Sequence, residues 1–292
     1  MAKYYKPSGK FNPIAFLYFG GISLIALPIL GLLYAYAIWY IPFIYINFII
    51  AGIFGFVIAF LINLVVVRYG KVRNPSLVFI LSVIAGLIAL YFHWAVWVDL
   101  VINAGESYGS SRIGITVSNI KLIQTFNLAL QPGVLFDLIG EINKYGTWGI
   151  RSATVSGIFL TIIWIIEAII IIGATVLTTI GSASVPFCEL GNEWFKEKDL
   201  PAFNYVENTP EMIKNLENSN PESFKELILA ESVEKNHSVF TLYSSNHNEN
   251  YLTVTNKRAK TNKKGELEFD TNGVVEYIFL NSELKQALLA IK

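Results

Sequence analysis

Four long apolar blocks with almost no charged residues constrain the fold of this chain more than any other feature. Between Phe11 and Val98 the only charged side chains are Arg68, Lys71 and Arg73. Each block exceeds the roughly 20 apolar residues that a helix needs to cross a bilayer. In lipid such a block must be helical, because no water satisfies an open backbone. We therefore expect four transmembrane helices, at about Pro13–Tyr40, Phe43–Val67, Leu77–Ile102 and Val155–Ile180.

The chain changes character at Gly181, after which charged residues become frequent. This last part holds 12 Lys and Arg against 17 Asp and Glu, so it is acidic. An acidic domain argues against nucleic acid as a partner, because phosphate neutralisation dominates that binding. The single cysteine, Cys188, excludes an intrachain disulfide and any site with several cysteine ligands. Residues 181–292 are therefore predicted to form a separate soluble domain.

Lysine and arginine near the helix ends predict the orientation in the membrane. The N-terminal residues 1–12 carry three lysines and the turn after the second helix carries three more basic residues, whereas the first turn has none. We expect a cell (inner) membrane protein whose N-terminus, second turn and C-terminal domain all face the cytoplasm. An aromatic belt is expected at the outer end of the first two helices. The basic residues are Lys3, Lys6, Lys10, Arg68, Lys71 and Arg73, and the belt residues are Tyr34, Tyr36, Trp39, Tyr40 and Tyr45.

The segment 103–151 is too long for a simple turn between the third and fourth helices. Gly105–Ser111 resembles a flexible loop, and Ser118–Leu130 is expected to contain a short helix. Pro132 suits the first position of an amphipathic helix. That helix either packs on the bundle as a plug, lies flat in the interface, or forms a ligand lid or partner surface. Asp99, at the end of the third helix, is expected to be solvated.

Three polar side chains lie within the predicted membrane helices, and they are Glu167, His93 and Asn63. A charged residue at the bilayer centre costs about 3 kcal/mol on insertion scales, so Glu167 is expected to face protein. One hypothesis is a proton relay or solute site formed by these three residues, with His93 as the partner of Glu167. The other is a hydrogen-bonded cluster that fixes helix packing.

Small residues recur along the predicted helices at spacings that place them on one face. Ala51, Gly55 and Ala59 follow each other at intervals of four, and Gly86 belongs to a similar row in the third helix. Such rows let helix backbones approach closely in lipid. They are expected to pack helices within the chain or to join two copies of it in a homo-oligomer.

Motifs for catalysis or cofactor binding are almost absent. Gly105–Gly109 matches the nucleophile pattern around Ser107, but no strand precedes it and no histidine follows on the same side. The chain contains neither HExxH nor a phosphate-binding glycine loop. Two non-membrane histidines and one cysteine do not complete a zinc site. We expect no cofactor, no metal and no enzymatic activity.

The soluble domain is predicted to be α+β, with a small antiparallel sheet. Helices are expected from Thr209, from Asn220 to Ala230 and from Ser282 to Ile291. Strands are expected at Val239–Ser244, Tyr251–Thr255, Glu266–Phe269 and Val274–Leu280, with turns at Asn246–Asn250 and Asp270–Gly273. The fold class is therefore a membrane all-α bundle of four transmembrane helices followed by a cytoplasmic α+β domain.

A basic cluster lies in the C-terminal domain, at a predicted strand end and its turn. It is expected either to contact anionic lipid, at roughly 1 kcal/mol per residue near the surface, or to be a solvated hairpin tip. The cluster comprises Lys257, Arg258, Lys260, Lys263 and Lys264.

These observations favour a non-enzymatic membrane-anchored scaffold or sensor, with the lipid bilayer and an unidentified protein as partners. The alternative is a small-solute or proton-coupled transporter or channel that uses Glu167 and His93. A membrane-embedded enzyme is disfavoured, because only one deep acid exists and Ser107 has no evident base.

Overall fold

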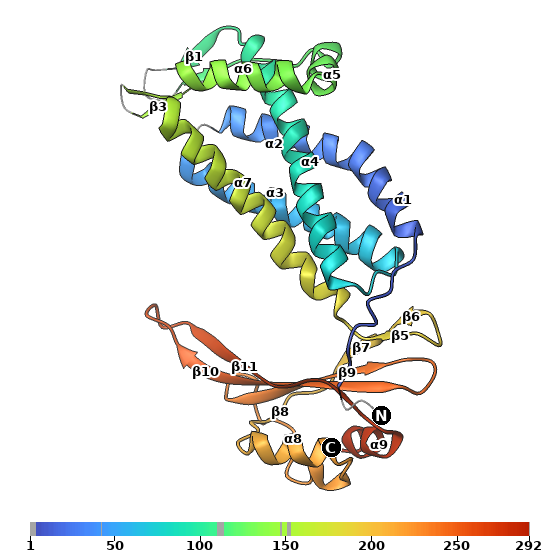
Figure 1. The fold of residues 1–292 in the computed structure, drawn as a ribbon. Coiled ribbons are helices and arrows are strands. Elements are labelled where there is room, and N and C mark those ends of the chain that lie inside the picture. The colour runs from blue at the N-terminus through green and yellow to red at the C-terminus, as the bar shows by residue number, and fades with distance from the viewer. Residues whose placement is uncertain (1–3, 42, 110–113, 147, 151–152, 292) are drawn as a thin grey trace. The chain divides into compact units, whose positions relative to one another are not determined.

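The computed structural model describes residues 4–41, 43–109, 114–146, 148–150 and 153–291. The chain divides into two compact units (Figure 1). One unit is Gly9–Ala183, which we call the helical unit. The other joins the N-terminal segment up to Ser8 with Ser184–Lys292, and we call it the sheet unit. Lys3, one of the residues used for orientation, lies outside the described residues.

Four helices of the helical unit are long and apolar enough to cross a membrane, which confirms the main prediction from the sequence. The first combines α1 (Ile14–Gly21), a π-helical segment and α2 (Leu27–Tyr40). The second combines α3 (Ile44–Leu61) with a π-helical end at Ile62–Tyr69. The third is α4 (Pro75–Ile102), and the fourth is α7 (Gly157–Thr179) with a 3-10 turn to Ala183. We call the end with Tyr40 and Ile102 the distal end, and the opposite end the proximal end.

Glycine allows two pairs of these helices to approach closely. A side chain added at Gly31 of α2 would meet the backbone nitrogen of His93 at 2.8 Å, and one at Gly55 of α3 would meet the carbonyl oxygen of Ile171 at 2.6 Å. Any larger residue would therefore force these helices apart. Pro28 lies two residues after the π-helical segment Ile22–Ala26, where the regular hydrogen-bond pattern is already interrupted.

Two short helices cross the distal end of the bundle (Figure 1). They are α5 (Leu122–Leu130) and α6 (Pro132–Tyr145), and the chain bends by 106° between them. Leu135, Leu138, Ile139 and Ile142 of α6 pack on the distal ends of the membrane helices, as a plug would. Two hairpins flank the pair: β1 (Ser107–Gly109) with β2 (Gly114–Thr116), and β3 (Trp148–Ile150) with β4 (Ala153–Val155). Gly105–Ser111, which the sequence predicts to be a flexible loop, therefore contains strand β1. Residues 110 and 111 of this segment lie outside the described part.

The sheet unit is built on an antiparallel sheet with the order β11-β10-β9-β7, and β8 also pairs with β9. Two helices, α8 (Thr209–Glu217) and α9 (Ser282–Leu289), lie on one face (Figure 1). Between helices and sheet is a core that includes Phe203, Phe240, Leu252 and Ile278. A region of helices and strands therefore follows the membrane helices, as predicted. The strands are β7 (Lys196–Asp199), β8 (Phe203–Asn204), β9 (His237–Ser244), β10 (Asn250–Thr261) and β11 (Leu267–Phe279); a separate hairpin joins β5 (Phe187–Cys188) to β6 (Glu193–Trp194).

Two local predictions for this unit are wrong. Asp270–Gly273 is not a turn but the middle of β11, where Asp270 pairs with Arg258 and Gly273 with Thr255. The turn-forming residues are tolerated because a full-length partner strand supplies their hydrogen bonds. The helix expected up to Ala230 is only a 3-10 turn at Pro221–Phe224. Beyond it, the side chain of Asn204 accepts a hydrogen bond from the backbone nitrogen of Ile228, which draws the chain onto β8 instead.

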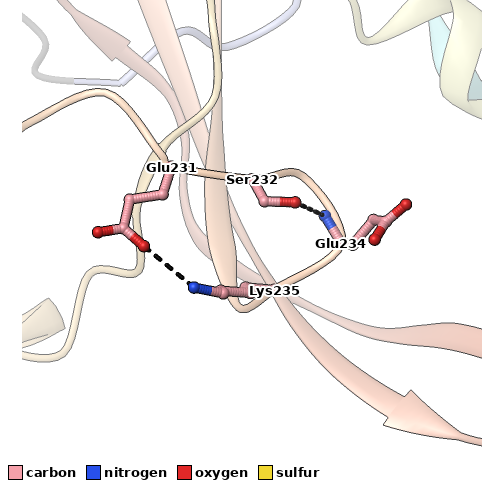
Figure 2. Close-up of polar contacts among 4 residues, drawn as sticks. All are labelled: Glu231, Ser232, Glu234 and Lys235. Atoms are coloured by element: carbon pink, nitrogen blue, oxygen red, sulfur yellow. Dashed lines mark hydrogen bonds and ion pairs between the residues drawn. The ribbon is translucent and has the colours of Figure 1, made fainter.

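The chain enters β9 through an exposed turn (Figure 2). Lys235 forms an ion pair with Glu231 at 3.0 Å, and Ser232 accepts a hydrogen bond from the backbone nitrogen of Glu234. Both charged side chains are well exposed, so this ion pair contributes at most about 1 kcal/mol. Its role is local, in shaping the turn.

The N-terminal segment is built into the sheet unit, which the sequence did not predict. The backbone nitrogen of Tyr5 donates to the carbonyl oxygen of Tyr277 at 2.9 Å, and Tyr4 forms a bridge with Ile278. Burial and the hydrogen bond that Tyr4 donates to Glu217 raise the pKa of the Tyr4 phenol to about 12. The N-terminal segment and the C-terminal domain therefore form one folded body.

Candidate functional site

Three polar side chains from three helices gather in the distal half of the bundle. Glu167 comes from α7, His93 from α4 and Tyr34 from α2, and all three are at least nine-tenths buried. The rings of Tyr34 and His93 lie 4.7 Å apart between centroids, and the Tyr34 hydroxyl lies within electrostatic range of the Glu167 carboxylate. We call these three residues the distal polar group. Tyr34 thus lies close to both of the residues that the sequence singled out.

Two members of this group lack a hydrogen-bond partner within the described part of the chain. Both ring nitrogens of His93 and the hydroxyl of Tyr34 are buried and unpaired. Buried polar side chains are nearly always hydrogen-bonded, and an exception in a folded protein points to strain, to a functional role or to a bound water or ion. His93 is the candidate partner of Glu167 from the sequence, and no hydrogen bond or ion pair joins these two described residues. The polar atoms of His93 and Tyr34 are therefore left unsatisfied by the described residues.

Aromatic rings surround the distal polar group. Phe54 of α3 stacks on Tyr34 with the ring centroids 4.4 Å apart. Trp94 contacts His93 and lies edge-on to Trp164, which occupies the position one turn before Glu167 on α7. Trp97 completes a cluster of three tryptophans. Tyr34 itself had been assigned to the interfacial belt, which is wrong, because only 3% of its surface is exposed.

Asn63, the third polar residue expected at this site, lies elsewhere. It belongs to the proximal half of the bundle, where its side-chain nitrogen donates to the carbonyl oxygen of Thr178 at 3.3 Å. In the same half Ser82 and Thr179 share a hydrogen bond of 2.7 Å, and the Thr175 hydroxyl donates to Gly55. These contacts tie α7 to α3 and α4, so they act as structural links between helices.

The small residues expected at helix contacts all face α7 or are fully buried. Gly55 lies against Ile171 and Ala174, and Gly86 lies against the side chain of Ile172. Ala51 and Ala59 have no exposed surface. Both neighbouring helices therefore use a small residue to approach the same stretch of α7.

Asp99 was expected to be solvated, and this expectation is wrong. The residue is fully buried, and one carboxylate oxygen accepts hydrogen bonds from the backbone nitrogen of Lys121 at 2.8 Å and from the Thr125 hydroxyl at 3.0 Å. Asn103 donates to its other oxygen. A carboxylate at this position stabilises the first turn of α5, because free backbone N–H groups point out of a helix N-terminus.

In the sheet unit, the N-terminal segment and the segment that follows α7 both pack on one aromatic patch. The ring of Tyr5, in the N-terminal segment, packs edge-on against Tyr251 and Tyr277. Val185 and Cys188, which follow α7 in the chain, pack on Tyr243 and the same two tyrosines. We call Tyr243, Tyr251 and Tyr277 the tyrosine patch; it lies on the sheet face opposite α8 and α9.

The basic cluster lies on the outer part of the β10–β11 hairpin. Acidic residues of β11 oppose it across the strand pair: Lys260 is paired in register with Glu268 and forms an ion pair with Asp270. Lys263 and Lys264 sit in the exposed turn. The cluster is thus partly neutralised, and its remaining charge is concentrated at the tip.

The other residues considered for catalysis or metal binding have little structural support. Ser107 lies in β1, one strand of a two-stranded hairpin, and not on a strand-to-helix turn. Among the described residues, no group of three or more His, Cys, Asp or Glu side chains is arranged to hold a metal ion. Cys188 is buried and accepts a hydrogen bond from the backbone nitrogen of Gly191.

No protein-family model, curated protein or solved structure matches this chain.

Proposed function

We propose that this protein is a non-enzymatic, membrane-anchored scaffold or sensor, and that the sheet unit is its interaction module on the cytoplasmic side. The observation that carries the proposal is the tyrosine patch. Two separate segments of the chain, one before α1 and one after α7, reach this patch. Tyr5 packs on Tyr251 and Tyr277, and Val185 and Cys188 belong to the cluster that holds all three tyrosines. Both attachments of the sheet unit are therefore made on one sheet.

The basic residues support the cytoplasmic orientation. Lys10 and Arg73 lie together at the proximal end, where the backbone nitrogen of Arg73 donates to the carbonyl oxygen of Lys10 at 2.8 Å. The N-terminal lysines and the basic α3–α4 turn thus share one end of the bundle. Lysine and arginine favour the cytoplasmic side, so this end is assigned to the cytoplasm.

The proposal is tested by photo-crosslinking in intact cells. A photoreactive phenylalanine analogue replaces Thr253, on the sheet face of the tyrosine patch, or Glu222, on the opposite side of the sheet unit. We expect a discrete protein adduct from Thr253 and none from Glu222. Adducts to lipid alone, or none from any exposed position of the sheet unit, would contradict an interaction module.

A matched pair of variants tests whether attachment at the patch matters. Tyr5→Ala removes the ring that packs on Tyr251 and Tyr277, whereas Tyr5→Phe retains it. The adduct from Thr253 should weaken with Tyr5→Ala and persist with Tyr5→Phe. Equal adducts from both variants would show that the attachment does not influence the interaction surface.

A second candidate function is transport of protons or a small solute through the bundle. It is favoured by the distal polar group, whose unpaired His93 nitrogens and Tyr34 hydroxyl lie near Glu167. An acid in the membrane that faces such neighbours is typical of proton pathways.

A measurement of proton flux into vesicles distinguishes transport from the scaffold or sensor function. Glu167→Gln should abolish proton-driven flux in reconstituted vesicles, while Ser82→Ala, which alters a polar contact in the proximal half, should retain it. A wild-type protein with no flux, or a Glu167→Gln variant that keeps it, would remove transport from consideration.

A further inference from the structure

Helix α5 carries its apolar residues on the outside. Leu122, Ile123, Phe126 and Leu130 lie on one face, and their side chains are 63–80% exposed. The opposite face holds Leu128 and the half-buried polar residues Gln124 and Thr125. This arrangement is the reverse of that expected for a helix on the water-exposed surface of a protein.

Polar contacts fix the inner face of α5. Thr125 and the backbone of Lys121 bond to the buried carboxylate of Asp99, and Gln124 accepts a hydrogen bond from Asn103 at 3.2 Å. Because these contacts hold the polar face inward, α5 cannot rotate its apolar residues into the protein without losing them. The outward orientation of the apolar face of α5 is therefore fixed by hydrogen bonds within the fold.

Aromatic side chains of the membrane helices hold the segment around α5 at one depth. The Trp39 indole nitrogen donates to Thr116 and the Tyr40 hydroxyl donates to Ser118, while Tyr91 donates to Ala129 of α5 at 2.7 Å. Tyrosine and tryptophan with one polar end are typical of the boundary between lipid headgroups and acyl chains. Asp99, which caps α5, lies within the last turn of the membrane helix α4. The exposed face of α5 is thus placed at the level of lipid.

A groove of about 790 Å³ opens where the chain bends between α5 and α6. The surface of its lining is mostly apolar, and its polar lining residues are Lys121, Gln124, Asn127 and Gln131. The apolar lining residues include Ile120, Leu122, Ile123, Leu128 and Val134.

We propose that α5 is a lipid-binding element of the distal leaflet. Acyl chains cover Leu122, Ile123, Phe126 and Leu130 and enter the groove at the bend, and the ammonium group of Lys121 faces the phosphate of the same lipid. The apolar lining fits a hydrocarbon chain, and one cation beside it complements an anionic headgroup. This inference is independent of the proposed function of the sheet unit.

The outer face of helix α6 differs from that of α5 because it carries charged residues. Its apolar residues Leu135, Leu138 and Ile139 pack inward, while Glu141 and Lys144 form an exposed ion pair on the outer face. The exposed apolar residues of α6 are confined to its first turns, at Val134 and Phe136, next to the bend that joins it to α5. The boundary between lipid and water is therefore expected to cross α6, between Phe136 and the ion pair of Glu141 and Lys144.

Site-directed fluorescence quenching tests the proposal in the full chain. With Cys188 replaced by alanine, Phe126→Cys and Leu130→Cys report on the apolar face of α5, and Lys144→Cys on α6 is the matched control. Each protein is labelled with a small fluorophore and reconstituted in nanodiscs of phosphatidylcholine and phosphatidylglycerol. Quenching is then measured with brominated lipid and, separately, with aqueous iodide.

Strong quenching by brominated lipid at positions 126 and 130, with iodide quenching confined to position 144, is the expected result. Iodide quenching at 126 equal to that at 144 would place the face in water and overturn the proposal. Protection of position 126 from both quenchers would mean that protein covers it, which also overturns the proposal. For the headgroup contact, Lys121→Gln should lower the amount of phosphatidylglycerol retained after delipidation without lowering that of phosphatidylcholine. Equal retention by both proteins would remove Lys121 from the site.

Discussion

Two regions of the helical unit differ in how their buried polar groups are paired. Around α7 in the proximal half, Ser82, Thr175 and Thr179 all make hydrogen bonds between or within helices. In the distal polar group, the His93 ring nitrogens and the Tyr34 hydroxyl are unpaired although both side chains are almost fully buried. Polar contacts between membrane helices stabilise a bundle only when both partners are present. The hydroxyl groups around α7 thus contribute to packing, whereas the distal polar group keeps polar atoms that no described residue pairs.

The contrast is best tested by measuring the stability of matched variants in detergent or nanodiscs. If it is correct, removing a paired polar group around α7 lowers stability, and removing an unpaired group of the distal polar group does not.

The largest effect is expected at Gly55. In Gly55→Ala the new methyl group would meet the Ile171 carbonyl oxygen at 2.6 Å and the Ala174 side chain at 2.8 Å, so α3 and α7 must separate. Overpacking of this kind costs about 1–3 kcal/mol, and disturbing the Thr175–Gly55 hydrogen bond adds to it. Gly52→Ala is the control, because its nearest neighbour would be an ordinary contact at 3.9 Å. Equal thermal stability of the two variants would show that α3 and α7 do not pack as described.

A smaller loss of stability is expected from removing the hydrogen bond between Ser82 and Thr179. Ser82→Ala and Thr179→Val each remove one partner, so each variant should be less stable and the double variant should show non-additivity. The coupling free energy should be about 0.6–1.7 kcal/mol, the range found between membrane helices. It is measured by a double-mutant cycle of unfolding. A coupling free energy of zero would show that the two hydroxyl groups do not interact.

The smallest effect, of opposite sign, is expected at Tyr34. Tyr34→Phe removes a buried hydroxyl that has no partner in the described structure, so stability should stay unchanged or rise by up to about 1 kcal/mol. The control is Tyr40→Phe, which loses a hydrogen bond to Ser118 and should lower the melting temperature. A loss of stability in Tyr34→Phe as large as that in Tyr40→Phe would mean that the distal polar group is structural glue. The contrast between the polar groups around α7 and the distal polar group would then fail.

The sequence predicted the candidate site only in part. Glu167 and His93 were identified because an acid and an imidazole within apolar runs stand out at once. Tyr34 was missed because a tyrosine near a helix end is typical of the interfacial belt, and only the packing of α2 on α4 at Gly31 turns it inward. Asn63 was grouped with the other two although it lies in the other half of the bundle. Helix periodicity identifies a face, but it does not determine the depth at which faces of different helices meet.

Local patterns also failed where long-range pairing decided the structure. Asp270–Gly273 has the composition of a turn, yet pairing with β10 makes it part of one long strand. The N-terminal segment looked like a short basic tail, and Tyr4 and Tyr5 join a sheet unit whose other strands begin beyond residue 180. Asp99 looked solvated because a segment more than 20 residues later in the chain buries it.

The sequence by itself determined four helices that are long and apolar enough to cross a membrane and the change from apolar to charged composition at about residue 180, because hydropathy adds up along a continuous stretch of chain. It also determined the class of the C-terminal domain, because strand and helix periodicities are local. Only the tertiary structure decided which polar atoms are paired, which face of α5 points outward and where the N-terminal segment ends. These features depend on contacts between residues far apart in the chain, and such contacts leave no periodic trace in the sequence.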